Sequence, residues 1–176
     1  MHRIFVGLLP PPEIRDALLD LEGHIDGARW QDEAQLHLTL RYCGEMPGER
    51  AEDLVLALQR LDAPCPTVAI KGVGHFEKKG VPSAVWAAVA PDKALSTLQK
   101  RVERAVQSVG LAPEARHFVP HLTLARLNRS SGPIHPWLLQ HAALSLPPWK
   151  SLHFSLFESH LSRQGSRYEE IIRITL

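Results

Sequence analysis

The hydrophobic residues of this chain follow two spacings, one typical of helices and one typical of strands. Between residues 13 and 25, apolar side chains recur every three to four positions, as at Ile14 and Leu18. This spacing predicts a helix with one buried face. Between residues 36 and 42, leucines alternate with polar residues. This alternation predicts a strand that points its leucines to the core and its polar side chains to the opposite face.

The same reading along the rest of the chain gives a mixed set of elements. Helices are expected at residues 13–25, 49–61 and 92–109. Strands are expected at 3–9, 36–42, 67–73, 83–89, 115–118, 121–124, 151–159 and 169–175, and Trp30 is expected to open an extended stretch. Turns or loops are expected at 44–48, 77–80 and 129–132, which contain glycine or polar residues. The pattern therefore predicts an α+β fold, with antiparallel sheets backed by helices.

The two halves of the chain carry the same tetrapeptide. His-Leu-Thr-Leu occurs at residues 37–40 and again at residues 121–124. In each half, a helix pattern precedes a strand that bears this motif, which indicates a duplication and a molecule with pseudo-two-fold symmetry. We expect a single domain over residues 1–176, built of two similar lobes at about 1–85 and 86–176, between which strands can be exchanged.

Composition limits the classes of function. The 176 residues carry a net charge of +1, so there is no general basic surface to attract nucleic acid, and an RNA partner would need a local group of cations. Cys43 and Cys65 do not have the spacing of a metal site. The sequence shows neither a leader pattern nor an apolar run long enough to cross a bilayer. We expect a cytoplasmic monomer without a membrane or an obligate protein partner.

The duplicated motif supplies the chemistry. His37 and Thr39 are two residues apart on a strand and therefore share a face, and so do His121 and Thr123. One imidazole can accept a proton while the other donates one, which is what cleavage of a phosphodiester requires. The threonine hydroxyls can donate hydrogen bonds to the phosphate between them. His37 and His121 are thus the predicted catalytic pair.

Two arginines follow the motifs and could add charge-assisted hydrogen bonds to a phosphate. Strict alternation places Arg41 on the face of His37, but it places Arg126 on the leucine face. A bulge or a strand end after Leu124 would turn Arg126 towards the histidines. The ten histidines do not form a metal motif, since no His-Glu-x-x-His is present and Pro120 opposes a helix between His117 and His121. We expect no metal and no cofactor, and there is no glycine-rich nucleotide loop.

The two motifs and their context resemble the 2H phosphoesterase superfamily, and in particular its bacterial and archaeal RNA 2′,3′-cyclic phosphodiesterases, which are also called 2′-5′ RNA ligases. The matching stretches are Trp30, His37 to Glu45, Phe118 to Arg126, Gly74-His-Phe76, Val85-Trp-Ala87, Gly165-Ser-Arg-Tyr-Glu169 and the opening Arg-Ile-Phe-Val-Gly-Leu. The resemblance spans nearly the whole chain. Tyr42-Cys43 departs from it mildly, because the family usually has an aromatic residue, often Phe, followed by an aliphatic one.

The resemblance implies a bilobal fold in which two antiparallel sheets line a central cleft and helices lie on the outside. It implies metal-independent hydrolysis of 2′,3′-cyclic phosphate ends of RNA to 2′-phosphates, with a reversible, ATP-independent ligation in which a 5′-hydroxyl replaces water. It also implies that Thr39, Thr123 and Arg126 hold the phosphate, and it favours His121 as the base and His37 as the acid.

Other substrate contacts are expected from the residues around the motifs. Arg41 and Tyr42 follow the first motif, and Phe76 precedes a lysine-rich loop and could stack on a base. The substrate itself stays open at this stage. The alternatives are a phosphodiesterase that acts on 2′-5′ oligoadenylate or on small cyclic nucleotides, and a non-catalytic module that binds nucleotides or RNA.

Overall fold

The computed structural model describes residues 1–176, which form ten strands and four helices. The helices are α1 (Pro12–Leu19), α2 (Gly48–Gln59), α3 (Lys93–Ser108) and α4 (His135–Gln140). The strands are β1 (His2–Leu8), β2 (Arg29–Trp30), β3 (Leu38–Met46), β4 (Thr67–Val68), β5 (Ile70–Lys78), β6 (Val81–Val89), β7 (His121–Arg126), β8 (Trp149–Lys150), β9 (His153–Ser162) and β10 (Gly165–Thr175).

Eight of the strands form one antiparallel sheet, in the order β10-β9-β1-β3-β7-β6-β5, with β2 paired to β7. The short strands β4 and β8 form a second, separate sheet. The α+β class is thereby confirmed. The two cleft-lining sheets that the sequence led us to expect are continuous, because β3 and β7 pair at Leu38 and Leu122. The two copies of the motif therefore lie side by side at the centre of the large sheet.

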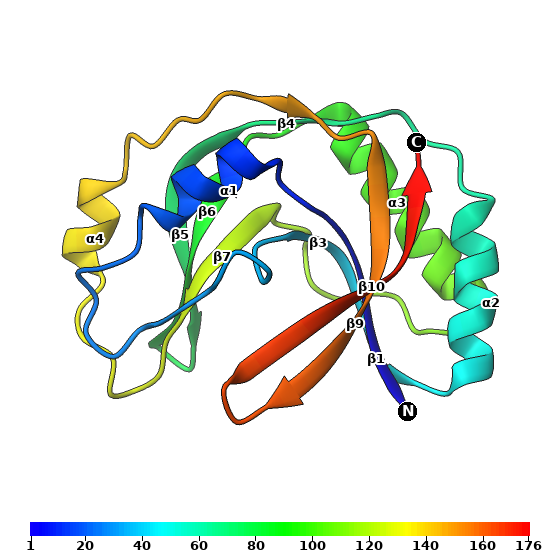
Figure 1. The fold of residues 1–176 in the computed structure, drawn as a ribbon, viewed down its shortest axis with the longest axis horizontal. Helices are drawn as coiled ribbons and strands as arrows, with labels where there is room; N and C mark the ends of the chain where they lie inside the picture. The colour runs from blue at the N-terminus through cyan, green and yellow to red at the C-terminus, as the bar shows by residue number, and fades with distance from the viewer.

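The halves of the large sheet do not follow the halves of the chain. One half contains β1, β3, β9 and β10, and the other contains β2, β5, β6 and β7, so each half combines strands from the first and second halves of the sequence. In Figure 1, α2 and α3 lie beside the first half, and α1 and α4 lie at the opposite end of the molecule. The boundary expected near residue 85 therefore separates the two repeats of the sequence, but it does not separate the two halves of the sheet.

The leucines of the motif strands anchor this centre. Leu38 and Leu122 are fully buried, and Leu36, Leu40 and Leu124 are nearly so. Burying one such side chain stabilises the fold by about 1.5–3 kcal/mol. Helix α3 packs against β3, and the buried residues of α2 and α3 belong to the same hydrophobic core as these leucines. The side chain of Asp92 caps α3 by accepting a hydrogen bond from the Leu95 N–H at 2.7 Å, which satisfies one of the unpaired donors of the first turn.

The first helix is shorter than its apolar spacing predicts. Helix α1 ends at Leu19 rather than at residue 25. Gly23 and His24 both have positive φ values, 123° and 63°, and this left-handed backbone cannot continue an α-helix. The apolar residue Ile25 is nevertheless buried. It reaches the core from a loop, which explains why the pattern resembles a longer helix.

Two further expectations were wrong, and one helix was missed. The turn expected at residues 44–48 is partly strand, because β3 continues to Met46 through a bulge and a positive φ of 77° at Gly44. No strand forms at residues 115–118, which run as irregular backbone towards the second motif. Helix α4 was not expected from the sequence at all. It has six residues, too few for a helical period to stand out.

Candidate active site

The two motif strands have the same pattern of exposure, residue by residue. From His37 to Tyr42 and from His121 to Arg126, the order is half-buried, buried, half-buried, buried, buried, exposed. Two consecutive buried residues break the strict alternation of a strand. In each strand the break lies at the last leucine of the motif, so the symmetry of the sequence extends to a local feature of the backbone.

A β-bulge causes this break in both strands. In β3, Val6 pairs with Arg41 and Gly7 pairs with Thr39, which leaves Leu40 as the extra residue. In β7, the pairs Val85–Ala125 and Trp86–Thr123 leave Leu124 as the extra residue. A bulge reverses the faces of all residues that follow it. The bulge expected after Leu124 is therefore present at that leucine, and Arg126 is exposed on the side of His121 and Thr123.

The bulge at Leu40 corrects the expectation for Arg41. Its side chain is only 9% exposed and lies on the helix side of the sheet. The guanidinium is 2.6 Å from a carboxylate oxygen of Glu103 on α3 and 3.4 Å from one of Glu114, and it donates a hydrogen bond to the Ala112 carbonyl at 2.6 Å. A buried cation with these partners is not free to bind a substrate. Arg41 is a structural residue, and Tyr42, 44% exposed, takes the cleft side instead.

Each histidine is held by the backbone carbonyl two residues before it. His37 Nδ1 donates to the Gln35 oxygen at 2.7 Å, and His121 Nδ1 donates to the Val119 oxygen at 2.6 Å. A carbonyl can only accept, so Nδ1 carries the hydrogen in both rings and Nε2 is left to exchange protons. The Thr39 hydroxyl lies 2.9 Å from Nε2 of His37 and donates to it when the ring is neutral. Both imidazoles are thus pre-oriented.

Both histidines favour the neutral form in the free site. Burial lowers the pKa of His37 to about 4, with smaller contributions from the positive charges of Arg126 and His121. Burial also lowers the pKa of His121, and Arg126 again contributes. In each case the hydrogen bond to the backbone carbonyl opposes the shift. The positive charge of Arg126 therefore favours the neutral form of both imidazoles.

Aromatic rings complete the surroundings of each imidazole. The rings of Phe5 and Tyr168 are centred 4.7 and 5.1 Å from that of His37. The rings of Phe76 and Trp86 are centred 4.8 and 5.4 Å from that of His121. Phe76, a candidate from the sequence, is therefore at the site. Such rings exclude water and lower the charge-stabilising capacity of the surroundings, which agrees with the lowered pKa values of the histidines.

The family model of the 2′-5′ RNA ligase superfamily matches residues 10–164, which is most of the chain and includes both motifs. This chain belongs to that superfamily. The match covers the two histidines, the two threonines and Arg126. It leaves out the first nine residues and the whole of β10.

Curated relatives are 25–30% identical to this chain over the residues that match. The RNA 2′,3′-cyclic phosphodiesterase of Thermus thermophilus is 30% identical over 187 residues, which cover 99% of this chain and 90% of the relative. The protein of the same name from Geobacillus stearothermophilus is 26% identical over 149 residues, or 84% of this chain. The present chain spans about half, 47%, of that longer relative.

A solved structure supports the fold. The crystal structure of TT0787 from Thermus thermophilus superimposes with a TM-score of 0.83 at 26% identity, and the match covers 99% of this chain and 97% of that one. The order of strands around the superfamily motifs is thus shared along nearly the whole chain.

Sequence reasoning did not assign Tyr168, Phe5 or Trp86 to the site. A signal was nevertheless present, because each of these residues lies in a stretch that resembles the family: the opening strand, Val85-Trp-Ala87, or Gly165 to Glu169. They were missed because only the pairing of strands, which the sequence does not show, brings their rings beside the histidines. Phe5 lies on β1, Trp86 on β6 and Tyr168 on β10. The sheet brings these distant segments beside the two motifs.

Gly74 shows how closely the rings are packed. A Cβ atom built at Gly74 would lie 2.3 Å from the Trp86 ring, far inside van der Waals contact. Gly74 and Trp86 are paired on neighbouring strands, and the indole lies over the glycine. A side chain at position 74 would therefore push the indole towards His121.

No group of three or more His, Cys, Asp or Glu side chains is arranged to hold a metal ion. None of the helices is long and apolar enough to span a membrane.

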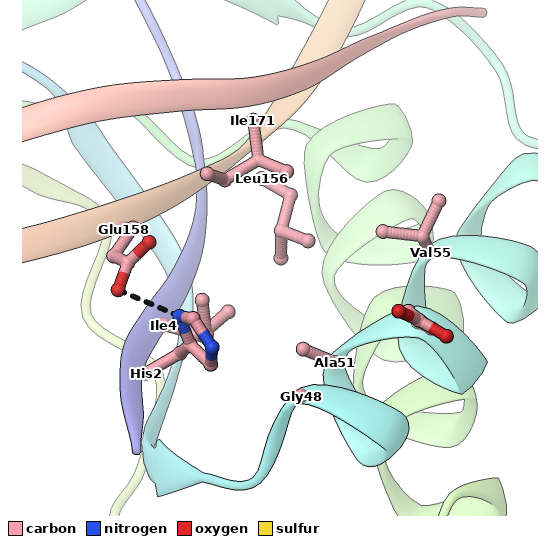
Figure 2. A pocket seen from close by; sticks show the side chains of 9 residues that line it. His2, Ile4, Gly48, Ala51, Val55, Leu156, Glu158 and Ile171 are labelled. Carbon is pink, nitrogen blue, oxygen red and sulfur yellow. Dashed lines mark hydrogen bonds and ion pairs between the residues drawn. The ribbon is translucent and has the colours of Figure 1, made fainter.

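A pocket of about 210 Å³ lies between α2 and strands β1, β9 and β10, lined by Ile4, Val55 and Leu156 among others (Figure 2). Ile4 precedes Phe5 on the same strand and therefore points to the opposite face from His37. This pocket is separate from the histidines.

Proposed function

We propose that this chain is an RNA 2′,3′-cyclic phosphodiesterase that opens the cyclic phosphate to a 2′-phosphate by two-histidine acid–base catalysis, without a metal. The observation that carries the proposal is that His37 and His121 are held in the same orientation by the same kind of hydrogen bond. Each Nδ1 is held by a carbonyl, so each Nε2 is offered to a ligand, beside a threonine and within the field of Arg126. The names of the curated relatives support the same activity.

The reaction needs one proton acceptor and one proton donor. The base Nε2 accepts a proton from water while the water oxygen forms a bond to phosphorus. The bond between phosphorus and the 3′ oxygen breaks, and the acid Nε2–H gives its proton to that oxygen. The products are a 2′-phosphate and a 3′-hydroxyl. One proton has then moved from one histidine to the other, and exchange with solvent restores the starting state.

Three further side chains support the phosphate in this proposal. Thr39 and Thr123 share a face with their histidines, and their hydroxyls can donate to the non-bridging oxygens. The hydroxyl of Thr39 turns from His37 Nε2 to the phosphate when the imidazole is protonated, because a protonated Nε2 no longer accepts. Arg126 supplies the permanent positive charge that a transition state with extra negative charge requires.

Two indications of the proton roles point in opposite directions. The family resemblance favours His121 as the base and His37 as the acid. The burial of His37, which lowers its pKa to about 4, favours the neutral form that a base requires. Arg126 does not decide the matter, because it lowers the pKa of both rings. We propose the assignment that the family implies, with the anionic substrate raising the pKa of His37 so that it gains its proton on binding.

A substrate with a good leaving group tests this assignment, because such a group departs without a proton. We expect His37→Ala to regain most of the wild-type rate on a cyclic or aryl phosphodiester of this kind, and His121→Ala to stay slow. The opposite result would assign the base to His37 and the acid to His121.

The substrate class rests on the relatives' names and on the exposed cations near the cleft. Lys78 and Lys79 lie at the turn between β5 and β6, next to the strand that carries Phe76, and both are exposed. They could contact the RNA chain that precedes the cyclic end. In the proposed reverse reaction, a 5′-hydroxyl replaces water at the same site and forms a 2′-5′ linkage without ATP.

The deciding experiment is turnover of an oligoribonucleotide that ends in a 2′,3′-cyclic phosphate, with a strong chelator present. We expect hydrolysis to the 2′-phosphate, identified by separation from a 3′-phosphate standard. A 3′-phosphate product would contradict the proposed regiochemistry, and loss of activity with the chelator would indicate a metal-dependent hydrolase. Binding without turnover would indicate a non-catalytic module. Preference for 2′-5′ oligoadenylate or for a cyclic mononucleotide would change the substrate class but keep the mechanism.

A further inference from the structure

The duplicated motif offers two equivalent positions for a cation in the cleft, and only one of them is used. Position 42 and position 126 are each the fifth residue after a motif histidine. Both follow a bulge at the last leucine of the motif, and both side chains are exposed. Arg126 occupies this position in β7, whereas Tyr42 occupies it in β3. This difference between Tyr42 and Arg126 breaks the symmetry between the two motif strands, which otherwise have the same pattern of exposure.

The first half of the site has an arginine, but the bulge keeps it out of the cleft. Arg41 is equivalent to Ala125, and both are buried behind the sheet. The carboxylates of Glu103 and Glu114 neutralise the Arg41 guanidinium there. Arg126 is accordingly the only Lys or Arg among the groups that shift the pKa of either histidine. Of the two equivalent positions, only the one in β7 thus carries a permanent positive charge. Arg29 on β2 is paired with Arg126 and is exposed beside it on the same face.

Position 42 is close enough to the reacting groups for a charge placed there to matter. Tyr42 is the strand partner of Phe5, whose ring is centred 5.0 Å from that of Tyr168. Burial is the main cause that raises the pKa of Tyr168, and Tyr42 is a smaller one. The ring of Tyr168 in turn lies edge-on to His37, with centroids 5.1 Å apart. An arginine side chain at position 42 is long and flexible, so it could extend from this place towards a phosphate between the histidines.

This inference rests on the proposed function, because the charge of the ligand changes during that reaction. The cyclic phosphodiester carries one negative charge, and the phosphomonoester product carries up to two above its second pKa of about 6. A second arginine would strengthen binding of the dianion more than that of the monoanion, because Coulomb attraction scales with the ligand's charge. We propose that Tyr42 is a specificity-determining residue that keeps a second cation out of the position equivalent to that of Arg126, so that the cleft binds the monoanionic substrate and releases the dianionic product.

The test compares wild type with Tyr42→Arg at pH 8. The inhibition constants of inorganic phosphate and of adenosine 2′-monophosphate measure affinity for the dianion. The KM for a 2′,3′-cyclic-phosphate oligonucleotide, with direct binding to a catalytically inactive His121→Ala background, measures affinity for the monoanion. We expect Tyr42→Arg to tighten phosphate binding about 10- to 100-fold, the range for one added charge-assisted hydrogen bond. The monoanion should gain only about the square root of that factor, about three- to tenfold.

The pH provides an internal control. At pH 5 inorganic phosphate is mostly a monoanion, so the gain from Tyr42→Arg should fall to that of the cyclic substrate. At pH 8 the turnover of Tyr42→Arg should become limited by product release, so that the multiple-turnover rate falls below the single-turnover rate. Equal gains for phosphate and for the cyclic substrate, or no gain for either, would overturn the proposal.

Matched variants separate charge from other effects. Tyr42→Gln removes the phenol without adding charge, and it should leave the ratio of the two affinities near the wild-type value. Leu139→Arg adds a cation on α4, where Leu139 is 65% exposed, and should change neither affinity. Tyr42→Lys supplies a second cationic variant should Tyr42→Arg fail to fold. Absence of turnover by the wild type would contradict the proposed function, whereas the phosphate affinities would still decide the role of Tyr42.

Discussion

At the scale of the residue, the site depends on how two imidazoles are held. A free histidine exchanges protons at either nitrogen, whereas the Gln35 and Val119 carbonyls fix the hydrogen on Nδ1 and leave Nε2 for chemistry. The sequence was sufficient to find these histidines, because His and Thr recur together in a way that burial alone does not require. It did not identify the carbonyls that orient them, since any residue type supplies a carbonyl.

We therefore expect each histidine to be essential. His37→Ala and His121→Ala should each lower turnover of a cyclic-phosphate end by about two to four orders of magnitude, the range for a general acid or base. Steady-state rates of the two variants and of the double variant provide the measurement. The double variant should be little slower than either single one, because the two residues act as a unit. Retention of more than a tenth of the wild-type rate by both single variants would contradict the two-histidine mechanism.

The rings around the histidines give a second expectation at this scale. Gly74→Ala should displace the Trp86 indole, because the new Cβ would lie 2.3 Å from the ring, and overpacking of this kind costs about 1–3 kcal/mol. We expect a lower melting temperature and a lower turnover together, with a change in tryptophan fluorescence. Gly74→Ala combined with Trp86→Leu should regain stability, since the smaller side chain removes the clash. Unchanged stability in Gly74→Ala would show that the packing is looser than the structure indicates.

At the scale of the element, the bulges decide what alternation alone cannot. The leucine–polar alternation correctly predicted the motif strands and their buried face. It failed one residue beyond each motif, because an extra residue at Leu40 and at Leu124 reverses the face of everything that follows. Arg126 is therefore exposed on the face of the histidines, whereas Arg41 is buried on the opposite face. A bulge depends on pairing with the neighbouring strand, which a single strand's sequence does not contain.

The other misses at this scale have the same origin. The apolar residue Ile25 resembles part of a helix but packs from a loop, and residues 115–118 have no strand partner. The long amphipathic helices were predictable because their stripes repeat over several turns. The exchange of strands between the halves of the sheet was not predictable in detail, because it is set by long-range pairing.

The two arginines after the motifs should respond to substitution in opposite ways. Arg126→Ala should weaken phosphate binding or transition-state stabilisation by about 1.5–3 kcal/mol, the range for hydrogen bonds to charged groups, with little effect on the free energy of unfolding. Arg41→Ala should leave the half-buried carboxylate of Glu103 and the Ala112 carbonyl without their partner and destabilise the fold by about 1–3 kcal/mol. Its effect on phosphate affinity in the folded protein should be small.

Denaturant unfolding and phosphate titration of both variants give the measurement. Arg41→Met keeps much of the apolar stem and serves as the control for packing. A loss of phosphate affinity in Arg41→Ala equal to that in Arg126→Ala would return Arg41 to the substrate site and contradict the assignment from the bulge.

At the scale of the whole molecule, the sheet buries the two histidines and thereby links catalysis and stability to pH. Both imidazoles have lowered pKa values in the folded protein, that of His37 about 4 against an ordinary 6.5. Between these values the unfolded chain binds more protons than the folded one. Folding stability should therefore rise with pH across this window and be lost as pH falls from 6.5 towards 4.

The size of this stability effect should be about 1–3 kcal/mol, since one pKa unit corresponds to 1.36 kcal/mol. Unfolding of wild type and of His37→Gln between pH 7 and 4 measures it, and the variant should lose less stability on acidification. Glu114, whose pKa is lowered to about 2 mainly by hydrogen bonds with Arg116, loses its contribution below about pH 4.5 in both proteins and cancels in the comparison. Parallel curves for the two proteins would contradict the burial of a neutral His37.

The catalytic rate should have a bell-shaped dependence on pH with two apparent pKa values, because turnover needs one neutral and one protonated imidazole. The kcat/KM profile reports the free enzyme, in which both values lie below 6.5, so its alkaline limb should begin below pH 6.5. The kcat profile reports the substrate complex, where the bound anion favours the imidazolium and raises both values. We expect the kcat bell to lie at higher pH than the kcat/KM bell. A rate that rises steadily from pH 5 to 9 would instead indicate attack by hydroxide or a metal-bound water.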